Sequence, residues 1–230
     1  MSIRLPRALD ATTLADLEAA LRRETGVWEI RGADDESFCT GLDIEAVEGR
    51  AHRQAVDTFS SVLAELADGL VPSVAVVDGV AQGGGVGVAA ACDVVVATES
   101  ARFCLPEMLF GLVPGAIWPV LRRRVSEAAL VRWAKTAQSV DAVEAHRFGL
   151  VDEVVDAAAM GRRVTHYRRM LGRPSSVAHA RLQALCRATR TIDLADAIRS
   201  GARRTEAALA ENDVVAARRR FVEGGVPWEA

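Results

Sequence analysis

The stretch that decides the fold is Val74-Ala-Val-Val-Asp-Gly-Val-Ala-Gln-Gly-Gly-Gly-Val-Gly-Val-Ala-Ala-Ala-Cys-Asp-Val-Val-Val-Ala97. It predicts a buried strand, a glycine triplet, a short apolar helix and a second buried strand. Because glycine has no Cβ, the triplet Gly83–Gly85 lets the backbone approach a ligand closely and point N–H groups at it. The helix that follows adds its positive end. This pattern indicates a hole that can hold a developing oxyanion.

Composition narrows the classes of partner. The chain has 230 residues, half of them apolar, which is enough for one large domain or for one domain and an appendage. Its formal net charge of −3 supplies no basic field for nucleic acid, so we expect no nucleic-acid partner. The four cysteines show no CxxC or Cys/His spacing, which predicts a reducing compartment and no metal site.

Two further patterns bear on location. The N-terminus Met-Ser-Ile-Arg-Leu-Pro lacks the features of a signal peptide, so we expect a cytoplasmic protein. The window from Leu70 to Ala97 is hydrophobic, but Asp78, Asp93, Pro72 and several glycines interrupt it. Alternating short buried strands therefore fit this window better than a membrane helix does.

The remaining pattern predicts an α/β chain in two parts. Apolar spacing predicts helices over residues 10–23, 55–67 and 116–124, and a strand over 27–31. A capped helix over 140–149 precedes a strand over 150–155. From residue 157 onward the pattern is almost wholly helical. We therefore predict a core over residues 1–156 and a helical region over residues 157–230.

Six sequence blocks resemble one known family, in the family's order. They are Phe38-Cys-Thr-Gly-Leu-Asp43, Asp78-Gly-Val-Ala-Gln-Gly-Gly-Gly85, Cys92-Asp-Val-Val-Val-Ala-Thr98, Phe103-Cys-Leu-Pro-Glu107, Gly111-Leu-Val-Pro-Gly115 and Gly149-Leu-Val-Asp-Glu-Val-Val155. Together they resemble the enoyl-CoA hydratase/isomerase, or crotonase, superfamily. The end of the chain, Arg220–Glu229, is most similar to the subgroup of polyketide β-branching cassettes. Members of that subgroup dehydrate a 3-hydroxy-3-methylglutaryl group on an acyl carrier protein.

The resemblance implies a crotonase-like spiral of ββα units with a C-terminal helical region used for trimerisation. It also implies a thioester substrate whose enolate is stabilised by two backbone N–H groups, which fall on Leu42 and Gly84 in this chain. Backbone donors that are fixed beforehand hold such charge without reorganising. The competing interpretation is that Leu42 and Gly84 belong to ordinary tight turns, and it has more force for Leu42.

Hydratases of the family use two glutamates, and this chain keeps one of them. The glutamate of the Pro-Glu motif corresponds to Glu107, whose apolar sequence neighbours predict desolvation and a raised pKa suited to proton transfer. The other glutamate position is Gly87. A single carboxylate can remove an α-proton and return it to the departing hydroxyl, so dehydration by Glu107 alone is expected. Decarboxylation of a glutaconyl-type thioester and ordinary enoyl-CoA hydratase/isomerase chemistry stay open.

The remaining predictions concern binding. The predicted substrate-binding residues are Gly83, Gly85, Gly87, Phe110, Leu112, Pro114, Gly115 and Trp118; for Phe110, Leu112 and Trp118 the spacing also fits core packing. The acyl group is expected on phosphopantetheine, carried by acyl carrier protein or CoA, without any other cofactor. Arg122–Arg124 and Arg218–Arg220 could bind phosphate or carboxylate, or simply form solvated helix faces. A homotrimer or hexamer is expected. The rival hypothesis is a non-catalytic scaffold that binds an acyl chain or another enzyme.

Overall fold

The computed structural model describes residues 2–23, 26–34, 36–43, 50–190, 194–209 and 211–223, and it contains a five-stranded parallel sheet within residues 1–172. Its strands, in spatial order, are β1 (Ser2–Leu5), β2 (Trp28–Gly32), β4 (Ser73–Val77), β6 (Val94–Thr98) and β9 (Glu153–Val155). In register, Trp28 lies beside Ser73, and Val74 lies beside Val94. The runs of valine suit strands that are buried on both faces.

A second sheet consists of β3 (Ser37–Cys39), β5 (Val80–Gln82), β7 (Arg102–Cys104) and β8 (Val140–Asp141), parallel except where β8 pairs with β7. The chain passes from the first sheet to the second at β2–β3, β4–β5 and β6–β7. Gly79 turns the β4–β5 corner with φ 70°, and a Cβ there would lie 2.1 Å from the carbonyl oxygen of Glu36. Only glycine fits such a corner.

The corner at Gly79 corrects one sequence prediction. We expected a single buried strand before the glycine triplet, whereas the structure divides that stretch into β4 and β5. The unit β4, β5 and α3 (Gly84–Ala91) is one ββα turn of the chain. This ββα unit is the repeat that the expected α/β spiral requires.

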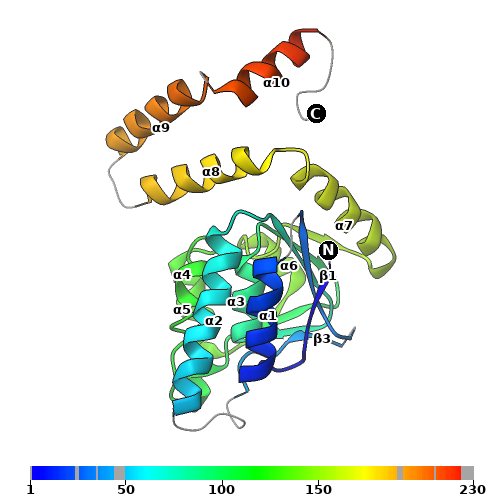
Figure 1. Ribbon diagram of the computed structural model, residues 1–230. Coiled ribbons are helices and arrows are strands. Elements are labelled where there is room, and N and C mark those ends of the chain that lie inside the picture. The colour runs from blue at the N-terminus through cyan, green and yellow to red at the C-terminus, as the bar shows by residue number, and fades with distance from the viewer. Residues whose placement is uncertain are drawn as a thin grey trace. The chain divides into compact units, whose positions relative to one another are not determined.

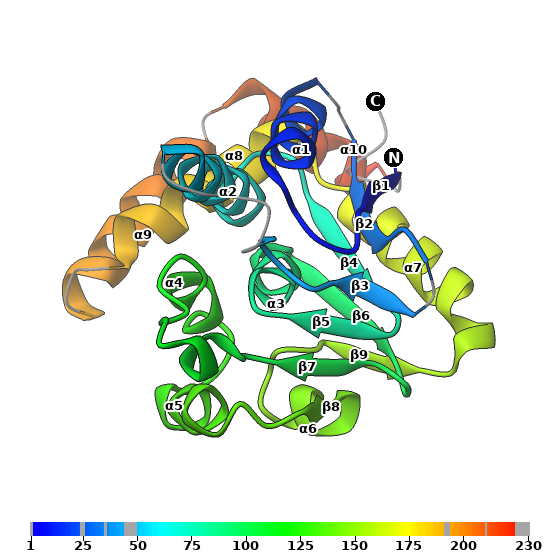
Figure 2. The same ribbon diagram turned by 90° about the horizontal axis from the view of Figure 1, so that it is seen from below.

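Helices cover both faces of the five-stranded sheet (Figure 2). α1 (Ala11–Arg23), α2 (Arg50–Asp68) and α3 lie on one face, and α7 (Ala157–Leu171) lies on the other. Along β4, Val74 and Val76 pack in the α7 cluster, whereas Ala75 and Val77 pack in the larger core. This alternation is the period of two that a strand imposes on its side chains.

Shorter helices complete the first part of the chain. They are the 3₁₀ helix η1 (Glu107–Phe110), α4 (Trp118–Leu121), α5 (Glu127–Thr136) and α6 (Ala142–Arg147). The helix predicted over 116–124 is shorter than expected, and the segment predicted as a helix over 140–149 begins with β8. Asp141 then caps α6, because its carboxylate accepts a hydrogen bond from the Glu144 amide at 2.7 Å.

The chain forms two compact units, residues 1–172 and 173–230. The sequence placed the boundary after residue 156, but α7 belongs to the first unit because Met160 and Val164 pack against the valines of the sheet. The second unit contains α8 (Ser176–Thr189), α9 (Leu194–Leu209) and α10 (Asn212–Val222), labelled in Figure 1. Residues 224–229 of the C-terminal motif lie outside the described residues.

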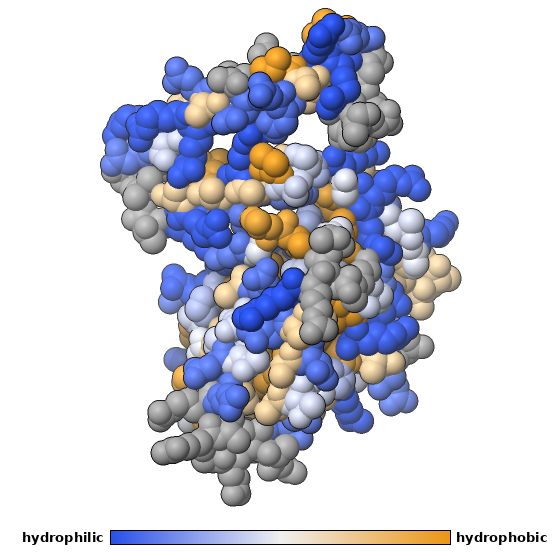
Figure 3. All heavy atoms as spheres, viewed as in Figure 1, coloured by the Kyte–Doolittle hydropathy of each residue, from blue (hydrophilic) through white to orange (hydrophobic). Residues whose placement is uncertain are grey.

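None of the side chains described in residues 173–223 is buried. Several large hydrophobic residues there are instead exposed: Val177, Leu182, Ile198, Val215 and Val222. Figure 3 accordingly shows hydrophobic residues scattered over a largely hydrophilic helical surface in this unit. Across the described residues, no helix is long and apolar enough to cross a bilayer.

Candidate active site

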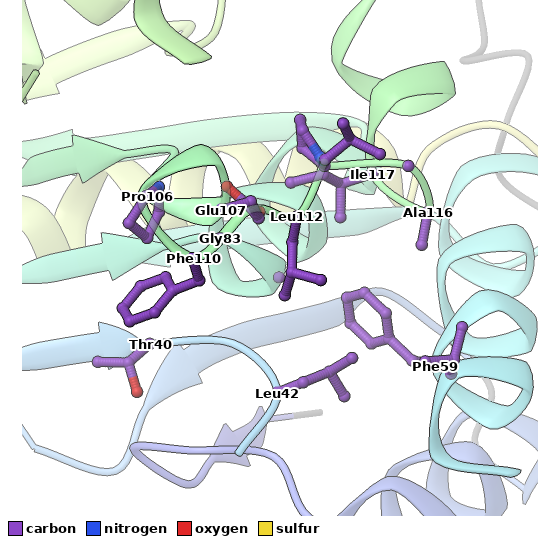
Figure 4. Close-up of a pocket in the computed structure, with 15 residues that line it drawn as sticks. Thr40, Leu42, Phe59, Gly83, Pro106, Glu107, Phe110, Leu112, Ala116 and Ile117 are labelled. Carbon is purple, nitrogen blue, oxygen red and sulfur yellow. The ribbon is translucent and has the colours of Figure 1, made fainter. Parts of the chain in front are cut away.

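A pocket of about 360 Å³ opens in the first unit, between the turn after β3, helix α2, the start of α3 and the segment from Pro106 to Ile117 (Figure 4). Its walls are mostly apolar, with Glu107 as the only charged side chain among the described residues that line it. The lining residues are Thr40, Leu42, Val56, Phe59, Gly83, Gly84, Pro106, Glu107, Phe110, Leu112, Val113, Pro114, Gly115, Ala116 and Ile117.

Two backbone amides meet at this pocket. Leu9 pairs with Leu42 in a parallel bridge, in which the Leu9 N–H donates to the carbonyl oxygen of Gly41 at 2.8 Å and the Leu9 carbonyl accepts from the Asp43 amide at 3.0 Å. In such a bridge the N–H of Leu42 points away from Leu9. Gly84 is the first residue of α3, so its N–H has no acceptor within the helix.

The backbone N–H groups of Leu42 and Gly84 lie close together, and both are free to donate a hydrogen bond to a ligand. A Cβ built on Gly84 would lie 3.5 Å from the Leu42 nitrogen and 3.1 Å from the Gly41 Cα. Over the described ranges, neither N–H has a hydrogen-bond acceptor in the protein. The structure thus brings together the two residues that the family resemblance implies as oxyanion donors, although they come from different ββα units.

Gly83 connects this backbone to the carboxylate. It has φ 49°, and its N–H donates to the carbonyl oxygen of Cys104 at 2.9 Å. A Cβ on Gly83 would lie 3.2 Å from Oε1 of Glu107. Gly83 and Glu107 lie close together because β5 pairs with β7 in parallel. Gln82 lies beside Cys104 in this pairing, so both strands end at the same edge of the second sheet.

Glu107 is a desolvated carboxyl group. It begins η1, and its backbone carbonyl accepts a hydrogen bond from the Leu112 amide at 3.0 Å. Its Oε2 atom is buried and has no hydrogen-bond partner among the described residues. Burial raises the pKa of Glu107 above its ordinary value. Figure 4 shows the carboxyl group next to Gly83. A carboxyl with this environment is suited to exchange protons with a ligand in the pocket.

Gly87 and Gly85 do not line the pocket, which corrects their prediction as substrate-binding residues. A Cβ on Gly87 would lie 2.1 Å from Cγ2 of Ile117, and a Cβ on Gly85 would lie 2.0 Å from the carbonyl oxygen of Cys39. Both glycines therefore permit close packing behind the pocket wall. Ile117 is buried and occupies the space into which a side chain at residue 87 would extend.

Of the other predicted binding residues, most line the pocket and one does not. Phe110, Leu112, Pro114 and Gly115 line the pocket, and Phe110 is 64% exposed, so core packing is the wrong interpretation for it. Trp118 does not line this pocket; it packs on the core and lines a second cavity.

Sequence reasoning missed several lining residues, including Thr40, Phe59 and Ile117. Phe59 belongs to the apolar stripe of α2, a signal that cannot distinguish core from pocket. The arginine run after α4 is engaged within the protein, since Arg122 pairs with Glu127, Arg123 with Asp68 and Arg124 with Asp152.

Comparison with known proteins identifies the family. The profile described as enoyl-CoA hydratase/isomerase matches residues 3–230. The chain belongs to this family. It is 34% identical to a probable enoyl-CoA hydratase of Rhizobium meliloti over 161 residues, which cover 64% of this chain and 60% of that protein. It is 32% identical to a carnitinyl-CoA dehydratase of Proteus mirabilis over 170 residues, 72% of this chain and 64% of that protein.

The matched segments thus span less than two thirds of the length of these two relatives. Solved structures agree on the fold of this hydratase/isomerase family member. Pseudomonas aeruginosa AtuE superposes with a TM-score of 0.87 at 30% identity, covering 98% of this chain and 95% of that one. The human enoyl coenzyme A hydratase domain-containing protein 3 superposes with a TM-score of 0.90 at 22% identity, covering 98% and 94%.

Proposed function

We propose that this chain is a lyase that dehydrates a β-hydroxyacyl thioester, with Glu107 as its only acid/base group. The observation that carries the proposal is the Glu107 carboxyl group, whose buried Oε2 atom has no hydrogen-bond partner among the described residues, beside the backbone N–H groups of Leu42 and Gly84, which have no acceptor there. Enoyl-CoA hydratases and carnitinyl-CoA dehydratases among the relatives act, by their names, on CoA thioesters. These relatives support a thioester substrate for this chain as well.

The chemistry follows from the positions of these groups. The thioester oxygen accepts hydrogen bonds from the Leu42 and Gly84 amides, and the Glu107 carboxylate takes the α-proton. The electron pair of the broken C–H bond forms the enolate, whose oxygen the two amides stabilise, each by about 3 kcal/mol. The enolate then expels the β-hydroxyl group, which leaves as water with the proton from Glu107. Glu107 removes the α-proton and delivers it to the departing hydroxyl group on the same face of the acyl chain.

A single carboxylate performs both transfers because the described pocket lining holds no second one. Ile117 occupies the space in front of Gly87, so that side of the pocket is apolar. A raised pKa helps Glu107 in both roles, since the group must bind and release a proton at nearly neutral pH.

The finer assignment is a 3-hydroxy-3-methylglutaryl group on an acyl carrier protein, as in polyketide β-branching. It rests on the sequence resemblance. Phosphopantetheine is common to CoA and carrier protein, so both carriers belong in the test.

The test is mass spectrometry of 3-hydroxy-3-methylglutaryl thioesters, on CoA and on carrier protein, incubated with wild type and with Glu107→Gln. Wild type should release water and the variant should not. Glu99→Gln is the matched control, because Glu99 is an exposed glutamate outside the pocket. Loss of carbon dioxide from a glutaconyl thioester would move the protein to decarboxylation. If wild type leaves all these thioesters and 3-hydroxybutyryl-CoA unchanged, the result contradicts the lyase proposal and favours the rival hypothesis of a non-catalytic scaffold.

We propose a homotrimer or hexamer in which the second unit contacts other copies. The support is that this unit exposes Leu182 and Ile198, while none of its described side chains is buried. Helices with unburied apolar residues gain stability from a partner. Native mass spectrometry of the full chain should give three or six copies. A Leu182→Glu and Ile198→Glu double variant should give smaller species; an unchanged mass would contradict the role of these faces.

A further inference from the structure

The hydroxyl group of Thr40 is bonded within the protein, although Thr40 lines the Glu107 pocket. It donates to the carbonyl oxygen of Arg7 at 2.8 Å, and the Thr40 N–H donates to the same oxygen at 2.7 Å. Figure 4 shows the Thr40 oxygen on the side away from Glu107. A hydroxyl group has one hydrogen, and here the Arg7 carbonyl takes it, so Thr40 has none to donate to a ligand. Its two bonds instead fasten the turn after β3 to the segment between β1 and α1.

The segment Arg7–Leu9 is a rigid support for this turn. Leu5, the last residue of β1, and Leu9 are both buried in the core. Asp10 follows and caps α1, because its carboxylate accepts a hydrogen bond from the Thr13 amide at 2.7 Å and its N–H donates to the Thr13 hydroxyl at 2.9 Å. Buried side chains and a capped helix together hold the backbone of this segment in one conformation.

The same segment sets the direction of the Leu42 donor. The Leu42 N–H and the Gly41 carbonyl belong to one planar trans peptide group, in which they point in opposite directions. The Leu9 N–H holds that carbonyl at 2.8 Å, so the Leu42 N–H points away from Leu9. The peptide group immediately before this one joins Thr40 to Gly41. A movement of Thr40 therefore turns the peptide group that carries the donor.

We propose that Thr40 is a positioning residue of the oxyanion hole, and that its hydroxyl group fixes the peptide group that carries the Leu42 N–H. The inference rests on the proposed function, because it takes the Leu42 N–H to bind the thioester oxygen. A donor that is fixed in place stabilises the charge of the enolate oxygen more than it stabilises the neutral carbonyl of the bound substrate. Loss of the hydroxyl group should therefore lower kcat and leave KM nearly unchanged.

The kinetic test removes the hydroxyl group and keeps the branched shape, in Thr40→Val. The Arg7 carbonyl still accepts the Thr40 N–H in this variant, so no buried acceptor loses its last partner. For the thioester that wild type dehydrates fastest, kcat should fall about tenfold, less than the roughly 100–1000-fold loss of a whole donor. Thr40→Ala, which also lacks the hydroxyl group, should show a similar loss, and Thr40→Ser should restore most of kcat.

Thr165→Val is the matched control. The Thr165 hydroxyl group also donates to a backbone carbonyl, that of Gly161, at 2.8 Å, but it does so within α7. Thr165→Val should leave kcat unchanged. An unchanged kcat in both Thr40→Val and Thr40→Ala overturns the proposal, and so does a loss of kcat that Thr40→Ser fails to rescue.

Infrared spectroscopy separates this inference from the proposed function. The probe is 3-hydroxybutyryl-CoA, isotopically labelled at the thioester carbonyl and bound to Glu107→Gln, so that no turnover is required. Hydrogen bonds from Leu42 and Gly84 should lower the carbonyl stretching frequency below its value in water. Adding Thr40→Val should reverse part of this shift, and adding Thr40→Ser should not.

The possible spectra distinguish the two failures. A full shift in the Glu107→Gln, Thr40→Val double variant overturns the role of Thr40 and leaves the proposed function standing. If Glu107→Gln with Thr40 intact gives no shift, the two backbone N–H groups do not bind the thioester oxygen. The oxyanion hole of the proposed function then fails, and the role of Thr40 fails with it.

Discussion

The close packing of Gly87 against Ile117 can be tested through stability. Replacing Gly87 with alanine in a helix should stabilise α3 by about 0.8–1.0 kcal/mol if nothing opposes it. The added Cβ would, however, lie 2.1 Å from Cγ2 and 2.7 Å from Cβ of Ile117, which is 3% exposed and cannot turn into solvent. Overpacking of this kind costs about 1–3 kcal/mol. Gly87→Ala should therefore be destabilising by up to about 2 kcal/mol.

The effect of Gly87→Ala on the free energy of unfolding should change from destabilising to stabilising when the side chain of Ile117 is removed. In an Ile117→Gly background the nearest remaining atom of that residue is its Cα, 3.7 Å from the added Cβ, which is ordinary contact. Gly87→Ala should then stabilise by about 1 kcal/mol, so the coupling between the two sites is about 1–3 kcal/mol. Ile117→Ala would not suffice, because its Cβ would stay 2.7 Å away.

Urea unfolding followed by circular dichroism measures all four forms of this cycle. Gly161→Ala is the matched control, since Gly161 lies in α7 and an added Cβ would meet nothing within 4 Å. That variant should be stabilised by about 1 kcal/mol. The reasoning is refuted if Gly87→Ala is as stable as Gly161→Ala, or if its effect is the same in both backgrounds. A glutamate at residue 87 could then enter the pocket, and the argument for a single carboxylate would weaken.

Further predictions concern protons, backbone donors and thiols. Because burial raises the pKa of Glu107 above 4.5, native stability falls as pH rises from the unfolded pKa through the raised folded pKa. Glu107→Gln should thus be more stable than wild type at pH 8 but not at pH 4, in urea unfolding; equal stability at both contradicts desolvation. Dehydration should speed up as pH rises through the raised pKa of Glu107, since the carboxylate is the base, and a flat pH–rate profile argues against this role. Gly84→Pro, which lacks the N–H, should lower kcat about 100–1000-fold more than Gly84→Ala, which keeps it; equal losses would exclude the amide as a donor. Burial raises the pKa of Cys39 to about 11 and that of Cys92 to about 12, so neither thiol should react with a thiol reagent at pH 8 before unfolding, as peptide mapping can check.

How far the sequence predicts the site depends on the kind of signal each residue carries. Leu42, Gly84 and Glu107 lie in motifs with ordered neighbours, and the structure brings them to one pocket. Ile117 carries no such signal, because an isoleucine before Trp118 looks like any core residue. Gly87 looked like a binding residue, although it serves packing, since the absence of a side chain does not say what fills the space.

The sequence by itself determined the alternation of short strands and helices, the glycine triplet at the start of α3 and the desolvated surroundings of Glu107. These follow from local periodicity and from the nature of neighbouring side chains, which act over a few residues. Only the tertiary structure decided that Gly79 divides the strand before the triplet, that α7 belongs with the sheet, and that Ile117 fills the space in front of Gly87. Those depend on contacts between residues far apart in the chain, which strand register and helix packing bring together.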